Sequence, residues 1–292
     1  MASLSRTEPT TTMRTLDRAE PTRQWVLEAR ARGECVGLVP TMGALHEGHL
    51  SLATAAVESC ERVVSSVFVN PTQFSPEEDY DRYPRDLDAD RRRLEQAGVD
   101  LLFAPPVEEL YPRGAETTVN VGSIGGVLEG VSRPTHFRGV ATVVTKLLQV
   151  APVDRLFLGQ KDYQQTVVLK QVVRDLMLPV EVVVCPTVRE QDGLAMSSRN
   201  SYLSAEERAR ALVLPRTLNG IVQAVAQGED DVQTLRQEAE SAFASEPGVT
   251  LDYLAFLAPG TVDPAERAEA GVVVAAAIRV GKTRLIDNEI LA

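Results

Sequence analysis

The chain has 292 residues, and its 41 Asp and Glu residues outnumber its 30 Lys and Arg residues, which gives a formal net charge of −11. An acidic chain repels polyanions at long range, so this charge argues against a nucleic-acid-binding surface. Any phosphate that the protein binds should therefore be small and held in a local pocket. The length suggests roughly two domains of about 150 residues each. Hydrophobic residues make up 44% and charged residues 24%, so a largely disordered chain is not expected.

The sequence predicts a soluble cytoplasmic protein. Its longest apolar runs, such as 272–278, fall far short of the roughly 18 residues that cross a bilayer. Residues 1–12 are rich in Ser, Thr and Pro and lack a signal pattern, which predicts a disordered N-terminal extension with Met13 as a candidate start. The cysteines are odd in number, far apart in the sequence and outside CxxC spacing, which predicts buried thiols in a reducing compartment at Cys35, Cys60 and Cys185.

Short apolar runs alternate with helical patterns through the first two thirds of the chain. Strands are expected at 36–40, 63–69, 99–104, 155–158 and 180–185. Helices are expected at 51–60, 86–98, 139–150 and 163–176. Strands that alternate with helices indicate a parallel sheet with right-handed crossovers. We therefore expect an α/β fold, with a Rossmann-like domain over residues 13–187.

The pattern changes after this region. A polar loop at 189–200 precedes a long helical stretch from Ser204 to about 227, and Ser204 with Glu207 forms a capping-box signature. Another helix is expected at 232–244, followed by strand-like segments at 250–257, 272–280 and 283–287. These elements predict a smaller α+β C-terminal domain, residues 188–292, which could act as a lid.

Two of the three histidines lie in one quartet, His46-Glu47-Gly48-His49. A zinc site is one interpretation, but the metalloprotease pattern places its two histidines four positions apart, and here they are three apart. A second interpretation is that the histidines only cap a helix. The third is that the quartet opens a helix directly after the first strand, where free N–H groups attract phosphate and imidazoles can donate hydrogen bonds to it.

Two further polar segments follow predicted sheet strands. Residues 159–165 come after the strand 155–158, and ligands of open α/β sheets bind outside the carboxyl ends of strands. Residues 196–200 form a loop with one cation and two hydroxyls. Solvated turns are the alternative for both segments. The P-loop-like residues 281–283 lack the required glycine, and the arginine run 91–93 is interpreted as a solvated helix face.

Five separated motifs together resemble the pantothenate synthetase, or pantoate–beta-alanine ligase, family. They lie in the same order as in that family, at 40–49, 69–74, 133–139, 161–165 and 196–200. The resemblance extends from about residue 14 to the closing segment 279–288. The His-x-Gly-His quartet alone would imply only the broader nucleotidyltransferase superfamily, so another adenylate-forming or nucleotidyl-transferring enzyme is the alternative. A non-catalytic nucleotide sensor would predict loss of Lys161, Ser197 and Arg199, and all three are present.

The resemblance implies an ATP-dependent condensation of pantoate with β-alanine through a pantoyl adenylate, with release of AMP and pyrophosphate. ATP would be a substrate used with Mg²⁺, and no organic prosthetic group is implied. The other partners would be small molecules only, without nucleic acid or membrane. A homodimer is also implied.

The same resemblance assigns candidate site residues. The catalytic group would be His46, His49, Lys161, Ser197, Ser198 and Arg199. ATP would also contact Pro40, Thr41, Met42, Gly48, Gly159, Asp162, Val188 and Met196. Pantoate would contact Met42, Asn70, Gln73, His136 and Gln165. The candidate metal ligands are Asp88 and Asp90. The family commonly has Glu where this chain has Gln160, so an acidic role at that position is in doubt.

Overall fold

A computed structural model describes residues 12–76 and 78–292 of the chain. The predicted N-terminal extension therefore lies outside the described residues, except for Thr12. The chain divides into two compact units. The first unit comprises the chain up to Gly159 and then Val168–Cys185; the second comprises Gln160–Val167 and Pro186–Ala292. The short segment that follows Gly159 thus belongs to the second unit.

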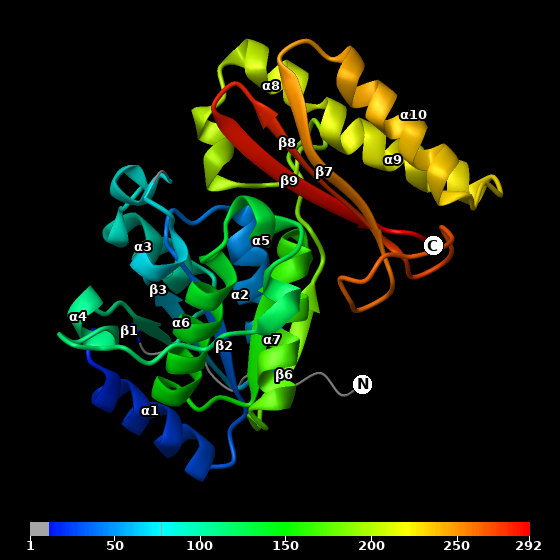
Figure 1. The fold of residues 1–292 in the computed structure, drawn as a ribbon. Helices are drawn as coiled ribbons and strands as arrows, with labels where there is room; N and C mark the ends of the chain where they lie inside the picture. Colours follow the sequence, from blue (N-terminus) through cyan, green and yellow to red (C-terminus); the bar gives the residue numbers. More distant parts are fainter. Residues whose placement is uncertain (1–11, 77) are drawn as a thin grey trace. The chain divides into compact units, whose positions relative to one another are not determined.

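The first unit is built on a six-stranded sheet in which every neighbouring pair is parallel, in the order β1-β4-β3-β2-β5-β6 (Figure 1). The strands are β1 (Arg14–Leu16), β2 (Val36–Thr41), β3 (Arg62–Val67), β4 (Leu101–Phe103), β5 (Arg155–Gly159) and β6 (Glu181–Cys185). The helices are α1 (Ala19–Ala31), α2 (Glu47–Ser59), α3 (Leu87–Gln96), α4 (Val107–Leu110), α5 (Glu129–Ser132) and α6 (His136–Val150), with α7 (Tyr163–Asp175) continuing into this unit. The predicted α/β class is confirmed.

Helices cover both faces of this sheet because its strands alternate between two apolar cores. Leu38 and Leu156 point to a core that includes residues of α1 and α6, whereas Val39 and Phe157 point to a core with α2 and α3. Successive strand residues face opposite sides, so a strand buried on both faces reads as a continuous apolar run. That property made these strands visible in the sequence.

The sheet has one topological switch point. From β2 the chain passes to β3 and β4 on one side, whereas β5 pairs with the other side of β2 through Leu38 and Leu156. Ligands of open α/β sheets bind outside the carboxyl ends of the strands at such a point. The ends of β2 at Thr41 and of β5 at Gly159 therefore mark where a ligand site is expected.

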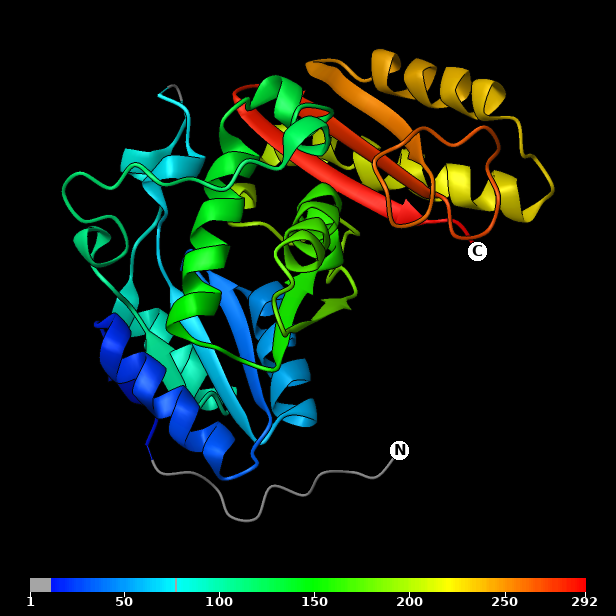
Figure 2. The ribbon, with the colours of Figure 1, turned by 60° about the horizontal axis from the view of Figure 1, so that its bottom comes forward.

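The second unit has a three-stranded antiparallel sheet in the order β7-β8-β9, and helices pack against it to close an apolar core (Figure 2). Its elements are β7 (Val249–Leu257), β8 (Val273–Val280), β9 (Thr283–Ile290), α8 (Ala205–Ala211), α9 (Val213–Ala226) and α10 (Val232–Ser245). The single long helix predicted from Ser204 is wrong, because the chain breaks at Leu212 into α8 and α9. The capping box of Ser204 and Glu207 is confirmed.

Sequence reasoning missed β1, α1, α4 and α5, and it misjudged one thiol. The edge strand β1 has only three residues, and α4 and α5 have four residues each. The buried residues of α1 are Thr22, Val26 and Ala29, so its buried face has only one large apolar residue and its apolar pattern is weak. Cys35 is half-buried, not buried, and its Sγ lies 3.4 Å from Sγ of Cys60. Burial and the Cys35 thiol raise the pKa of Cys60 to about 12, so Cys60 stays protonated at neutral pH.

Within residues 12–76 and 78–292, no helix has both the length and the apolar character needed to cross a bilayer.

Candidate active site

The turn that follows β2 in the first unit has an unusual backbone. Gly43 has φ +84° and Ala44 has φ +52°, so two consecutive residues are left-handed. This conformation costs a non-glycine residue roughly 1–2 kcal/mol. Thr41 Oγ1 donates to the Ser66 carbonyl (2.7 Å) and accepts from the Gly43 amide (3.2 Å), which fixes the entry to the turn.

A carboxylate from α3 stabilises the strained part of this turn. Asp90 is only 3% exposed, and its two oxygens accept from the amides of Ala44 (3.0 Å) and Leu45 (2.8 Å). Arg93, one helical turn later, donates to the Leu45 carbonyl. The amide and the carbonyl of Leu45 therefore both bond side chains of α3. Arg93 is exposed, as predicted for the arginine run, and it also donates to this turn.

The predicted histidine pair begins α2 directly after the turn. His46 is the N-cap residue with extended backbone, and its amide donates to Nδ1 of His49 at 3.3 Å. The two ring centroids are 4.0 Å apart. A neutral His49 that accepts at Nδ1 must carry its proton on Nε2. The pair thus offers an imidazole N–H beside the positive end of a helix, which suits a phosphate.

The four predicted pantoate contacts of the first unit form one connected group. The Asn70 amide donates to Oε1 of Gln73 (3.0 Å), and the Gln73 amide contacts Sδ of Met42 (3.0 Å). His136 Nδ1 lies 3.1 Å from the Gln73 carbonyl. Gly139 of α6 lets this helix lie close to the segment that carries Gln73, since a Cβ at Gly139 would lie 2.4 Å from the Thr72 carbonyl oxygen. The structure thus brings together residues that are far apart in the sequence.

An ion pair that the sequence did not indicate supports His136. Arg133 bonds both carboxylate oxygens of Glu78, and its Nη1 lies 3.2 Å from His136 Nε2. Burial raises the pKa of Glu78, but the hydrogen bond and charge of Arg133 outweigh burial, so the pKa lies below its ordinary value of 4.5. Glu78 is a polar loop residue in the sequence, and nothing local to it signals this partner.

A cavity of about 240 Å³ lies beside the turn that follows β2. Its lining includes Met42, Gly43 and Asp90, together with apolar residues at the ends of β3 and β4 such as Val67 and Ala104. The turn therefore borders a hollow at the carboxyl edge of the sheet.

The acidic pair proposed as a metal site does not fit one. Asp88 is exposed, whereas Asp90 is buried with both oxygens already accepting from the turn. Residues two positions apart on a helix do not face each other. The ranges 12–76 and 78–292 contain no group of three or more His, Cys, Asp or Glu side chains that could hold a metal ion.

In the second unit, the predicted Lys161 and Asp162 lie in the 3₁₀ turn η4 (Gln160–Asp162). Lys161 Nζ is 3.6 Å from a carboxylate oxygen of Asp162. Gln165 is half-buried near the start of α7. Tyr163 Oη donates to the Thr261 carbonyl at 2.8 Å, which ties this segment to the rest of the unit.

The other predicted ATP contacts of this unit lie in one structured loop. The Met196 amide donates to the Val188 carbonyl at 3.0 Å. Ser197 caps η5 (Ser198–Tyr202) by accepting from the Arg199 amide at 3.3 Å. Asn200 donates to Glu190 at 2.6 Å and to the Ala195 carbonyl at 3.0 Å. The loop thus presents Ser197, Ser198 and Arg199 from a hydrogen-bonded frame.

The fold and these sites together define a nucleotide-binding enzyme of the parallel α/β class. The sequence model of the family described as pantoate-beta-alanine ligase matches residues 14–290. The chain is 51% identical over 269 residues to the pantothenate synthetase of Pelotomaculum thermopropionicum, covering 92% of this chain and 95% of that protein. It is 54% identical over 256 residues to that of Acidobacterium capsulatum, covering 88% and 86%. The chain therefore belongs to the pantoate–beta-alanine ligase family.

Solved structures agree with this assignment. Pantothenate synthetase from Thermus thermophilus matches with a TM-score of 0.90 and 49% identity, covering 95% of this chain and 99% of that one. The pantoate-beta-alanine ligase of Francisella tularensis, solved in complex with beta-gamma ATP and beta-alanine, matches with a TM-score of 0.78 and 35% identity, covering 95% and 97%.

Proposed function

We propose that this chain joins pantoate to β-alanine through an amide bond at the expense of ATP. The observation that carries the proposal is the family match over residues 14–290. The motif residues of both units support it, because each predicted phosphate contact is present and held in an ordered segment.

The reaction divides into two balanced steps. In the first, a carboxylate oxygen of pantoate attacks the α-phosphorus of ATP, and the bond to the bridging oxygen breaks to release pyrophosphate. In the second, the amine of β-alanine attacks the acyl carbon of the pantoyl adenylate, loses a proton and displaces AMP. AMP is a far better leaving group than hydroxide, which is why the acid must first be activated.

The first step needs fixed charge and alignment more than proton transfer. We assign this task to His46 and His49 in the first unit and to Lys161, Ser197, Ser198 and Arg199 in the second. His49 donates from Nε2, and the helix start at Glu47 adds the partial positive charge of free amides. The remaining nucleotide contacts are Pro40, Thr41, Met42, Gly48, Gly159, Asp162, Val188 and Met196.

Pantoate is assigned to Met42, Asn70, Gln73 and His136 of the first unit and to Gln165 of the second. The neutral amides can both donate to the carboxylate and accept from the hydroxyls of this substrate. The hydrogen bond between Asn70 and Gln73 sets the direction in which the Gln73 amide donates.

For magnesium, the carboxylates of α3 do not supply a protein-built site, as the bonds of Asp90 show. Mg²⁺ commonly binds through one or two carboxylates together with substrate phosphates and water, and we route no step through it. We also propose, from the family resemblance, that the enzyme is a cytoplasmic homodimer. Size-exclusion chromatography with light scattering tests the dimer.

Isotope exchange between ATP and pyrophosphate tests the proposed function directly. Wild-type protein is incubated with ATP, Mg²⁺ and labelled pyrophosphate, with or without pantoate, and β-alanine is omitted. Label should enter ATP only when pantoate is present. Labelled pyrophosphate becomes part of ATP by reversal of adenylate formation, and no adenylate forms without pantoate. Exchange that needs an amino acid, or that proceeds without any acid, would overturn the proposal.

We propose in addition that residues 188–292 form a domain that acts as a lid protecting the adenylate from water. The loop 189–200 should then become resistant to trypsin when ATP binds. Identical cleavage at Arg189 and Arg199 with and without ATP would contradict the lid.

A further inference from the structure

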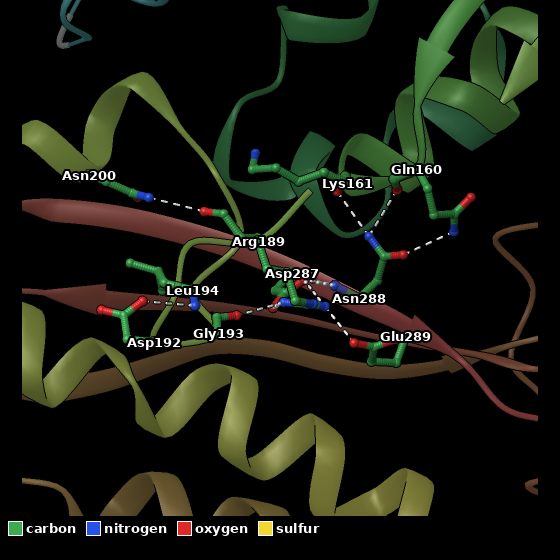
Figure 3. A network of polar contacts seen from close by, with 11 residues as sticks. Gln160, Lys161, Arg189, Asp192, Gly193, Leu194, Asn200, Asp287, Asn288 and Glu289 are labelled. Carbon is green, nitrogen blue, oxygen red and sulfur yellow. Dashed lines mark hydrogen bonds and ion pairs between the residues drawn. The ribbon is translucent and has the colours of Figure 1, made fainter. Parts of the chain in front are cut away.

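Asn288 of β9 uses its whole side chain to hold the segment that carries Lys161 (Figure 3). Its Nδ2 donates to the carbonyls of Gln160 (3.0 Å) and Lys161 (2.9 Å). Its Oδ1 accepts from Nε2 of Gln160 at 2.9 Å. Asn288 is only 3% exposed. Two donor hydrogens and one acceptor oxygen therefore all serve this one segment.

The orientation of this amide follows from its partners. Two backbone carbonyls can only accept, so the NH₂ group of Asn288 must face them. Its oxygen must then face Gln160, which has to donate. A carboxylate at position 160 has no hydrogen to donate at neutral pH and would place like partial charges together. The glutamine of this chain is thus matched to the asparagine.

The neighbouring residue of β9 holds the second predicted phosphate-binding segment. Asp287 is 1% exposed and accepts from both terminal nitrogens of Arg189, at 2.6 and 3.1 Å (Figure 3). Arg189 also donates to the carbonyl of Gly193 at 3.1 Å and to Glu289. Arg189 lies in the loop that leads to Ser197 and Arg199. Consecutive residues of β9 therefore support both cationic segments of the second unit.

We propose that Asn288 is a positioning residue for Lys161, with Gln160 as its partner. Asn288 acts on the backbone of residues 160 and 161 and touches no substrate. A rigid backbone there limits where the Lys161 ammonium can reach, and a misplacement of about 1 Å can cost on the order of 10²-fold in rate. This inference rests on the proposed function, because it assumes that Lys161 stabilises the transferring phosphoryl group.

Two substitutions of Asn288 test the proposal in the full-length protein. Asn288→Ala removes all three bonds, and Asn288→Asp replaces the donor by an oxygen that faces two carbonyls. Each should lower kcat for the pantoate-dependent exchange roughly tenfold or more, with the KM for pantoate within about twofold. Ile286→Ala, a truncation on the same strand, is the matched control and should leave both values near those of the wild type.

A double substitution separates positioning from a general structural effect. In a Lys161→Ala background, Asn288→Ala should lower kcat by less than about twofold, because the group that it positions is absent. A full additional tenfold loss would overturn the proposal. Gln160→Glu should lower kcat less than Asn288→Ala does. The kcat of Gln160→Met should be close to that of Gln160→Glu.

A measurement without turnover keeps this inference separate from the proposed function. Hydrogen–deuterium exchange of a peptide spanning 159–166 should speed up in Asn288→Ala while peptides of β7 and β8 stay unchanged. Unchanged hydrogen–deuterium exchange at 159–166 would overturn the positioning role even if the wild type is active. If hydrogen–deuterium exchange speeds up in Asn288→Ala but the wild type shows no pantoate-dependent activity, the proposed function is wrong, while the role of Asn288 in holding this segment stands.

Discussion

Two short segments, one in each unit, carry or directly precede predicted phosphate contacts, and they are held in different ways. The turn at 42–45 in the first unit is held through its amides by the carboxylate of Asp90, and the strand β2 leads directly into it. The segment at 160–161 in the second unit is held through its carbonyls by the neutral amide of Asn288. The charged support accepts hydrogen bonds from backbone amides, whereas the neutral support donates them to backbone carbonyls.

The difference follows from what each segment must leave available for a ligand. A carboxylate on the amides of Ala44 and Leu45 fixes a left-handed turn, so that the next amides, at the start of α2, can face an anion. The segment at Lys161 already carries a cation, and a carboxylate supporting it would compete with phosphate for that charge. A neutral amide adds no further negative charge beside Lys161, whose ammonium already lies 3.6 Å from a carboxylate oxygen of Asp162. Fixed supports of opposite type thus serve the same chemistry.

The largest expected effect concerns Lys161, in the segment of the second unit. Lys161→Ala should lower kcat by on the order of 10²-fold or more while folding normally, because a preorganised charge is removed. Steady-state kinetics and a thermal melt measure the two quantities. Lys170→Ala, at an exposed lysine of α7, is the matched control. Near-normal turnover in Lys161→Ala would show that this lysine is only a surface residue.

A smaller effect should come from the support of the first segment. Asp90→Asn leaves one acceptor oxygen and places an NH₂ group against an amide, so the left-handed turn loses a charge-assisted hydrogen bond, a loss of about 1–3 kcal/mol. Amide exchange at 43–46 should speed up, and kcat for pantoate-dependent exchange should fall roughly tenfold. Glu95→Gln removes the same charge from α3 without touching the turn and serves as the control.

The same variant distinguishes a support from a metal ligand. If Asp90 held Mg²⁺, excess Mg²⁺ should restore much of the lost activity. We expect no restoration, because the carboxylate acts on backbone amides. Recovery at high Mg²⁺ would break the comparison and return Asp90 to the metal site predicted from the sequence.

The smallest expected effect concerns pH and the ion pair near His136. The pKa of Glu78 is lowered in the folded protein, so its stabilising contribution is present above its ordinary pKa of 4.5 and is lost as the pH falls through the lower folded value. Glu78→Gln should therefore destabilise the protein at neutral pH, by about 1–3 kcal/mol. The difference from the wild type should disappear in acid.

Denaturant unfolding of both proteins across this pH range measures the effect. Asn288→Ala provides the contrast, because its neutral amide does not titrate and its cost should not vanish in the same window. A pH-independent difference between wild type and Glu78→Gln would show that the ion pair does not contribute through charge.

Local sequence signals were sufficient where the structure depends on short-range periodicity. The strands buried on both faces, such as β2 and β3, are continuous apolar runs, and the motif at 46–49 directly follows β2. The alternation of strands and helices then predicts a parallel sheet with right-handed crossovers. These features are enough to place the predicted ligand residues of the first unit at the carboxyl edge of its sheet.

The supporting residues could not be predicted because their partners are distant in the sequence. The Asp90 bonds join residues 45 and 46 positions apart, and the Asn288 bonds join residues 127 and 128 positions apart. An aspartate in the first turn of a helix usually faces solvent or the helix dipole, so nothing local marked Asp90 as an acceptor for a turn. The break at Leu212 did have a local signal, which apolar periodicity alone overlooked: Pro215 has no amide hydrogen, and its ring crowds the carbonyl four residues earlier, at the end of α8.

The long separation between Lys161 and Asn288 has a consequence for how the enzyme matures during synthesis. Asn288 is the 127th residue that the ribosome adds after Lys161, and at about 5–20 residues per second this takes several seconds or more. The core of the first unit, including the turn and the histidine pair, can fold during that interval. The segment at 160–161 cannot be completed until β9 has joined its sheet. A nascent chain therefore lacks the complete support of the Lys161 segment until β9 has been made.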